Sequence, residues 1–205
     1  MTNEERNNLI MSKLSIYLND YSDYINESMI NNIKNEFVFN DLKCINDKLY
    51  PSIGYFKDEY KYPCVLENDR EWMLITPNEI ETMKKSISEA TGNVLTYGLG
   101  LGYYAYMVSM KDNVESVTIV EKDKEIIDLF NKYILPQFKY KSKIKIINDD
   151  AFSYFKKDIY YDYVFVDIWH DPSDGIDLYL KFKSLEKENI KYSYWIEDTL
   201  KCYIE

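Results

Sequence analysis

Three glycines at alternate positions, Gly98, Gly100 and Gly102, are the residues whose type and spacing say most about chemistry. The chain has 6 glycines in 205 residues, so half of them lie in this short run. Glycine takes positive φ at little cost and has no Cβ, so it lets the backbone pass close to a ligand. A helix that follows such a turn directs its first N–H groups at whatever lies there. The run therefore predicts a nucleotide-type binding site.

Carboxylates follow the glycine run at spacings that suit the sugar and the base of a nucleotide. Glu121 ends an apolar segment 19 residues after Gly102, and a carboxylate there can accept hydrogen bonds from both ribose hydroxyls. The other interpretation of Glu121 is a charge favoured by a helix dipole. Asp149 and Asp150 follow the next apolar segment. One of them, with Asp150 preferred, can receive an adenine amine, while either can cap a helix.

A further polar cluster follows the apolar segment 163–166. It contains two carboxylates, Asp167 and Asp171, and the only histidine of the chain, His170. Such a cluster can hold a cation or move a proton, so these three residues are the candidate catalytic residues. Trp169, in the same loop, belongs either to the core or to the wall of a substrate pocket.

Alternating strands and helices must position these groups. Hydrophobic patterns predict strands at 93–97, 115–121, 143–148, 162–168 and 191–196, and helices at 77–89, 103–110, 123–132, 150–157 and 174–187. This alternation predicts an α/β fold: a Rossmann-like, mostly parallel, doubly wound sheet. In such sheets the ligand lies beyond the carboxyl ends of the strands.

The region before residue 76 has a different pattern. Helical spacing of apolar residues predicts one or two helices within 3–36. Residues 64–67 and 71–75 flank a short polar turn and predict a β-hairpin. We therefore expect an N-terminal extension of helices and a hairpin over 1–75, and a ligand-binding domain over 76–205.

Composition narrows the classes of partner. The net charge is −10 with 2 arginines, which disfavours nucleic-acid binding and is compatible with a cationic small-molecule substrate. Three separated cysteines suit a reducing cytoplasm, and with one histidine no metal site is expected. The uncharged run 90–110 is interrupted by the glycines, so it predicts a buried strand and helix rather than a membrane span. The first residues lack a signal-peptide layout. A homodimer is compatible with the sequence.

Taken in order, these motifs resemble the class I S-adenosylmethionine-dependent methyltransferases. The resemblance covers about residues 93 to 196 and implies S-adenosyl-L-methionine as cofactor, with the glycine turn beside its methionine part, Glu121 on the ribose and Asp150 near the adenine. The residues that it implies as cofactor-binding are Tyr97, Gly98, Gly100, Gly102, Glu121, Lys122, Asp150, Ala151 and Asp167.

Within that superfamily the chain is most similar to the spermidine-synthase-like branch, through residues 114–123, the hairpin before residue 76, and residues 161–167. It also departs from that branch. Aminopropyltransferases carry an aspartate where this chain has Leu101, and two serines between aspartates where it has Ile168, Trp169 and His170. The resemblance thus implies a small-molecule methyltransferase, with an aminopropyltransferase or a non-catalytic cofactor-binding module as alternatives. A nicotinamide enzyme is a further rival, since the glycines and Glu121 fit a dinucleotide fingerprint loosely.

Overall fold

The computed structural model describes residues 37–39, 54–56, 64–67, 70–75, 77–157 and 159–204. The chain divides into two compact units, Met1–Thr82 and Met83–Glu205. The division falls inside helix α3 (Pro77–Glu89), whereas the sequence places the domain boundary just before that helix. The boundary at residue 76 stays a prediction.

The described part of the first unit contains two antiparallel strand pairs. Strand β1 (Phe37–Phe39) pairs with β2 (Gly54–Phe56). Strand β3 (Cys64–Glu67) pairs with β4 (Arg70–Leu74) and forms the predicted hairpin, with an irregularity between Val65 and Leu66. The helices predicted within 3–36 lie outside the described residues.

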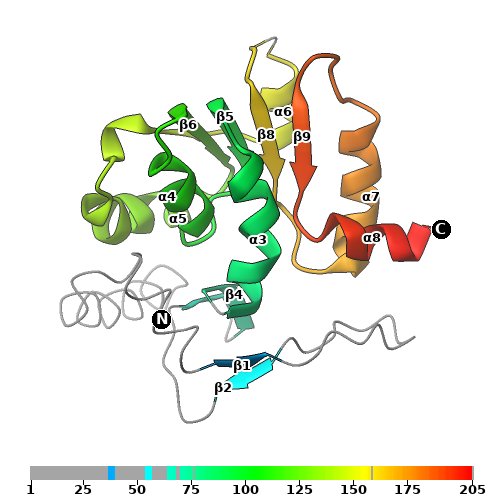
Figure 1. Ribbon diagram of the computed structural model, residues 1–205, viewed down its shortest axis with the longest axis horizontal. Coiled ribbons are helices and arrows are strands. Elements are labelled where there is room, and N and C mark those ends of the chain that lie inside the picture. The colour runs from blue at the N-terminus through cyan, green and yellow to red at the C-terminus, as the bar shows by residue number, and fades with distance from the viewer. Residues whose placement is uncertain are drawn as a thin grey trace. The chain divides into compact units, whose positions relative to one another are not determined.

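The second unit is built on a five-stranded parallel sheet (Figure 1). Its strands are β5 (Gly92–Tyr97), β6 (Val114–Glu121), β7 (Ile144–Asn148), β8 (Tyr163–Val166) and β9 (Lys191–Tyr194). Their order is β7-β6-β5-β8-β9, so the direction of strand addition reverses at β5. The predicted fold class is confirmed, and the reversal point is where such sheets bind ligands.

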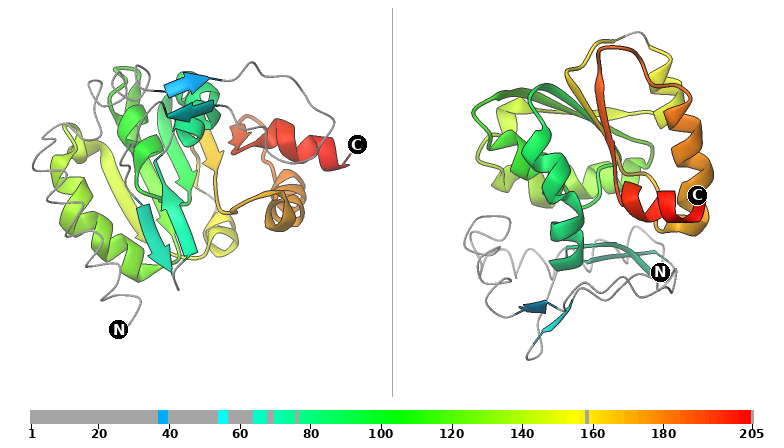
Figure 2. Two further views of the ribbon diagram at one scale, coloured as in Figure 1. Left: turned by 90° about the horizontal axis from the view of Figure 1, so that it is seen from below. Right: turned by 45° about the vertical axis from the view of Figure 1, so that its right-hand side comes forward.

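Helices cover both faces of this sheet (Figures 1 and 2). They are the end of α3, α4 (Tyr103–Ser109), α5 (Lys124–Leu129), α6 (Ala151–Phe155) and α7 (Pro172–Lys183), while α8 (Glu197–Ile204) packs beside α7. No helix in these ranges is long and apolar enough to cross a membrane. The uncharged run 90–110 is divided among β5, the glycine turn and α4, as predicted.

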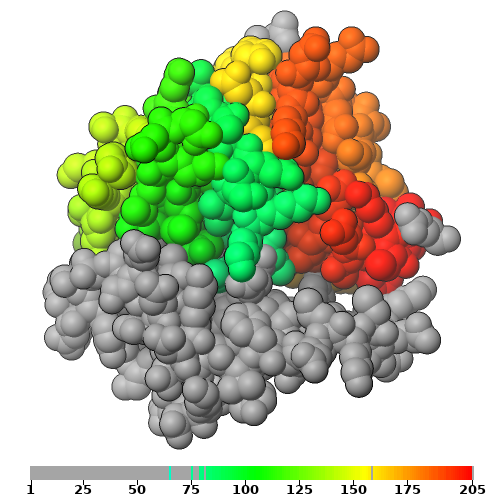
Figure 3. Space-filling model, in the orientation of Figure 1, coloured from blue at the N-terminus to red at the C-terminus, as the bar shows by residue number. Residues whose placement is uncertain are grey.

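Successive side chains of β5 point to opposite faces of the sheet, so this strand packs against the helices on both faces. Tyr97 packs against Phe182 of α7, with ring centroids 5.2 Å apart, and against Tyr154 of α6, at 6.5 Å. Its neighbour Thr96 points to the opposite face, where Tyr104 of α4 stacks on Phe165 at 4.2 Å. In the space-filling view, side chains of α4 and of the end of α3 close over one face of the sheet (Figure 3).

Several element boundaries differ from the sequence prediction by one or more residues, and two of these differences have a clear local cause. Helix α7 begins at Pro172 rather than 174, because Asp171 accepts a hydrogen bond from the N–H of Ser173 and caps the helix. The strand predicted over 191–196 ends at Tyr194. Ile196 then has a φ of 49°, in the left-handed region that a β-branched residue rarely adopts. That conformation turns the chain out of the sheet and into α8.

Buried tyrosines make the stability of this unit sensitive to alkaline pH. Burial is the main cause that raises the pKa of Tyr163 from 10.0 to about 12, and burial also raises the pKa of Tyr97 and Tyr104. The folded state favours the neutral phenol of Tyr163. The contribution of this phenol to the free energy of unfolding is therefore complete below pH 10 and is lost as the pH rises through about 12.

We therefore expect the free energy of unfolding, measured in urea, to fall between pH 10 and about 12. The variant Tyr163→Phe should show a smaller fall, because phenylalanine has no proton to lose. A wild-type protein whose tyrosines ionise in this range without any loss of stability would contradict this expectation.

Candidate functional site

The carboxyl ends of all five strands are joined by backbone hydrogen bonds that continue past the strands. The N–H of Gly98 donates to the carbonyl oxygen of Val120 at 2.9 Å, and the N–H of Asp167 donates to the carbonyl oxygen of Tyr97 at 2.9 Å. On either side, the N–H of Asp149 donates to Glu121 at 3.1 Å, and the N–H of Trp195 donates to Val166 at 2.9 Å. The loops that carry the predicted site residues therefore form one continuous edge.

The three glycines of the turn are needed for different reasons. All have positive φ: 97° at Gly98, 55° at Gly100 and 80° at Gly102. A Cβ on Gly98 would overlap the carbonyl oxygen of Asp167, and one on Gly102 would overlap the ring of Phe130. A Cβ on Gly100 would meet no atom within 4 Å. The protein's own packing thus explains Gly98 and Gly102, whereas Gly100 faces open space that a ligand can fill.

Glu121 joins the glycine turn to the start of α5. Its Oε2 accepts a hydrogen bond from the N–H of Leu99 at 3.1 Å, and its Oε1 accepts from the N–H of Asp123 at 2.9 Å. A carboxylate oxygen has two lone pairs, so each oxygen keeps the capacity to accept one ribose hydroxyl. Asp123, not Glu121, caps α5, because its side chain accepts from the N–H of Glu125. The capping of α5 therefore does not need Glu121, and the hydrogen bond to Leu99 ties the Glu121 carboxylate to the glycine turn instead.

The two aspartates after β7 have separate roles. Asp150 caps α6, with Oδ1 accepting from the N–H of Ser153 at 2.9 Å. Asp149 forms an ion pair with Lys157 at 2.6 Å, and this hydrogen bond is the main cause that lowers the pKa of its carboxyl. Asp150 is exposed at the site edge, so its second oxygen can serve an adenine amine while the first caps the helix.

The loop after β8 brings together a buried aromatic side chain and exposed polar groups. Trp169 is 5% exposed and stacks on Tyr194, with ring planes 14° apart. It belongs to the core, which settles the alternatives left open by the sequence. His170 is exposed and Asp171 is half-buried, and the carboxylate of Asp171 is engaged in capping α7. Asp167 begins this loop, directly beside Gly98.

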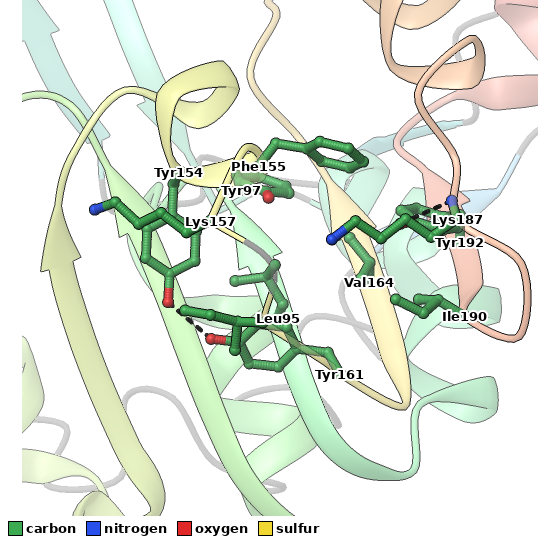
Figure 4. A pocket seen from close by; sticks show the side chains of 11 residues that line it. Leu95, Tyr97, Tyr154, Phe155, Lys157, Tyr161, Val164, Lys187, Ile190 and Tyr192 are labelled. Carbon is green, nitrogen blue, oxygen red and sulfur yellow. Dashed lines mark hydrogen bonds between the residues drawn. The ribbon is translucent and has the colours of Figure 1, made fainter.

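Three of the predicted cofactor-binding residues, Tyr97, Lys122 and Ala151, have no side-chain contact with the glycine turn among the contacts described. Tyr97 is 2% exposed and lies among aromatic rings on the α6 and α7 face. It lines a cavity of about 10 Å³, lying between α6 and the strands β5, β8 and β9 (Figure 4). That volume holds about one water molecule. Lys122 is exposed, and Ala151 is buried as the first residue of α6. Lys122 and Ala151 lie at the ends of β6 and β7, where their backbone flanks the edge.

Sequence analysis missed two polar side chains that shape this edge. The Nδ2 of Asn148 donates to the carbonyl oxygens of Glu121 and Lys122, at 3.0 and 2.9 Å, and holds the ends of β6 and β7 together. Asp174 completes a capping box with Asp171 at the start of α7. The spacing Asp171-Pro172-x-Asp174 was a signal for that cap, because proline favours the first helical position and an acid favours the third.

The arrangement can bind an adenosine-type ligand along the edge. From β5 outward it offers open space over Gly100, a carboxylate at Glu121 and a carboxylate at Asp150. Asp167 begins the next loop on the other side of Gly98. A sugar with two hydroxyls and a base with an amine match the two carboxylates in this order. The residues present thus fit the nucleoside part of S-adenosylmethionine.

Comparison with known proteins gives one family match. Residues 73–186 match the family described as the spermine/spermidine synthase domain. The matched region includes the β5 to α7 part of the sheet and every predicted site residue. No curated protein matches the chain.

Three of the solved structures with a similar fold are described as methyltransferases. A Klebsiella pneumoniae protein assigned as an O-methyltransferase is 13% identical, with TM-score 0.39, covering 53% of this chain and 50% of that one. The C-terminal domain of precorrin-6Y C5,15-methyltransferase from Rhodobacter capsulatus is 13% identical, with TM-score 0.43 and coverage of 58% and 60%. A Streptococcus mutans protein assigned as SAM-dependent methyltransferase is 19% identical, with TM-score 0.46 and coverage of 74% and 47%. The chain covers less than two thirds of each, and none bears on function.

Proposed function

The chain belongs to the spermine/spermidine synthase family, and we propose that within it this protein is an enzyme that uses S-adenosylmethionine to methylate a small molecule. The cofactor supplies an electrophilic methyl group on sulfur. Such a transfer is an in-line displacement, so holding the two reactants in line does most of the work. The glycine turn, Glu121 and Asp150 are the residues proposed to hold the cofactor.

The observation that carries this proposal is that the Glu121 carboxylate lies against the same turn in which Gly100 faces open space. Gly100 has a φ of 55° and open space where its Cβ would lie. Glu121 accepts from the N–H of Leu99, inside the same turn, and its carboxylate retains lone pairs. The protein's own atoms fill the corresponding space beside Gly98 and Gly102, and leave it open beside Gly100.

Two buried side chains favour methyl transfer over aminopropyl transfer. Leu101 is 5% exposed and stands where the resemblance to aminopropyltransferases expects an aspartate. Trp169 is 5% exposed and stands in the loop where the resemblance to those enzymes expects two serines between aspartates. Neither side chain carries a carboxylate that could form an ion pair with a cationic amine, so the acidic groups that would hold a decarboxylated cofactor and a polyamine are lacking at both positions.

The candidate residues for proton transfer remain in the loop after β8. Asp167 and His170 can take a proton from an acceptor that loses one, and Asp171 is a third candidate group nearby. A net charge of −10 suits a cationic acceptor. We propose that the substrate is a cationic small molecule. We also propose that the enzyme acts in the cytoplasm and assembles as a homodimer.

An isotope experiment separates the three candidate activities. S-Adenosylmethionine labelled in the methyl group, and separately in the aminopropyl chain of its decarboxylated form, is offered with a panel of small amines, phenols and carboxylic acids. We expect the methyl label alone to appear on an acceptor. Transfer of the aminopropyl label would replace the proposal by the aminopropyltransferase. Cofactor binding without transfer of either label would favour the non-catalytic module.

A further inference from the structure

Asp174, a carboxylate that the proposed function does not use, binds the only histidine of the chain. Asp174 lies in the first turn of α7, and His170 lies in the loop before it. The Oδ2 of Asp174 is 3.0 Å from Nδ1 of His170. The N–H of His170 donates to both oxygens of the same carboxylate, at 3.1 and 3.2 Å. One carboxylate thus fixes both the ring and the backbone of His170.

The charge of Asp174 decides which ring nitrogen carries the proton. Burial alone would raise the pKa of Asp174, but hydrogen bonds from the His170 ring and from the backbone N–H groups of Asp171 and His170 lower it overall. A carboxylate with a lowered pKa is ionised at neutral pH and can only accept hydrogen bonds. The Nδ1 of His170 must therefore donate, which makes Nε2 the acceptor of the neutral ring.

We infer that Asp174 is a positioning residue that holds the His170 imidazole beside the carboxyl end of β8 with its proton on Nδ1. The catalytic part of this inference rests on the proposed function. Nε2 of His170 takes the proton that a nitrogen or oxygen acceptor loses when that acceptor bonds to the methyl carbon. The electron pair of the broken sulfur–methyl bond stays on sulfur. The Asp174 carboxylate stabilises the imidazolium that forms.

Asp174 also has a structural role that the test must separate. It accepts a hydrogen bond from the N–H of Asp171 at 3.1 Å and completes the capping box of α7. Asp171 caps the same helix through the N–H of Ser173. The variant Asp171→Ala therefore weakens the start of α7 and leaves the carboxylate of Asp174 in place, which makes it the matched control.

Long-range proton–nitrogen NMR of the full chain reads the ring directly, since one histidine gives one set of imidazole signals. We expect the neutral ring of the wild-type protein to carry its proton on Nδ1. Asp174→Asn should shift it toward Nε2, which free histidine favours, Asp174→Glu should restore part of the Nδ1 form, and Asp171→Ala should change little. A wild-type proton on Nε2, or an equal change in Asp171→Ala, would overturn the inference.

Titration of the same variants with S-adenosylhomocysteine keeps the two proposals apart. If the wild-type protein does not bind this ligand, the proposed function fails whatever the ring shows. If it binds and the proton is on Nε2, only the present inference fails. On the acceptor found with the isotope labels, Asp174→Asn should lower kcat about 10-fold with KM little changed. An unchanged kcat would limit Asp174 to its structural role and refute the catalytic part.

Discussion

Replacing Gly98 with alanine is expected to lower the free energy of unfolding of the α/β unit by about 3 kcal/mol. Gly98 has a φ of 97°, which strains any side chain. Its Cβ would also overlap the backbone oxygen of Asp167, so the ends of β5 and β8 would have to separate. Both are backbone constraints that no rotamer change relieves. Urea unfolding followed by circular dichroism measures the loss.

The matched control is Gly100→Ala, two residues along the same turn. Its φ of 55° is also left-handed, but no atom lies within 4 Å of the added Cβ. We expect it to cost only about 1 kcal/mol of stability and to weaken S-adenosylhomocysteine binding at least about 10-fold, or ~1.4 kcal/mol. Equal stability losses in the two variants would contradict the distinction between a packing glycine and a ligand-facing one.

Replacing Glu121 with glutamine is expected to weaken S-adenosylhomocysteine binding by roughly 10- to 100-fold while the fold is kept. Hydrogen bonds to a charged group contribute about 1.5–3 kcal/mol each, and glutamine keeps only one carbonyl oxygen to accept them. The remaining oxygen can still accept from Leu99 or Asp123, so the turn should stay in place. Calorimetric titration measures the affinity, and thermal unfolding checks the fold.

Glu125→Gln is the control for charge. Glu125 lies in the first turn of α5, so its substitution removes the same charge near the same helix without touching the glycine turn. Its affinity should match that of the wild-type protein. If both glutamine variants weaken binding equally, Glu121 acts through general charge, and its assignment to the ribose would be wrong.

The sequence predicted the sheet and the glycine edge because these depend on local signals. Apolar segments mark β5, β6 and β8, segments that alternate polar with apolar or aromatic residues mark β7 and β9, and glycines in a glycine-poor chain mark the turn. The position of Glu121 follows from the same spacing, since a parallel sheet brings consecutive strand ends to one edge. The structure adds that Glu121 contacts the turn itself.

Other features depend on contacts between distant residues. Alternation puts Tyr97 and Thr96 on opposite faces, but the sequence cannot say which face α6 and α7 cover. The side chain of Tyr97 therefore lies in the core, away from the turn where the resemblance implied a contact. The contact of Asp174 with His170 was missed because the capping pattern was not used to set the start of α7.

The most direct test of the central claim, that the glycine turn and Glu121 bind S-adenosylmethionine, is a pair of calorimetric titrations on the wild-type protein. One uses S-adenosylhomocysteine and the other uses NADH, because a dinucleotide is the rival ligand for a turn with these glycines. The account predicts that S-adenosylhomocysteine binds and NADH does not. Binding of NADH alone would contradict it.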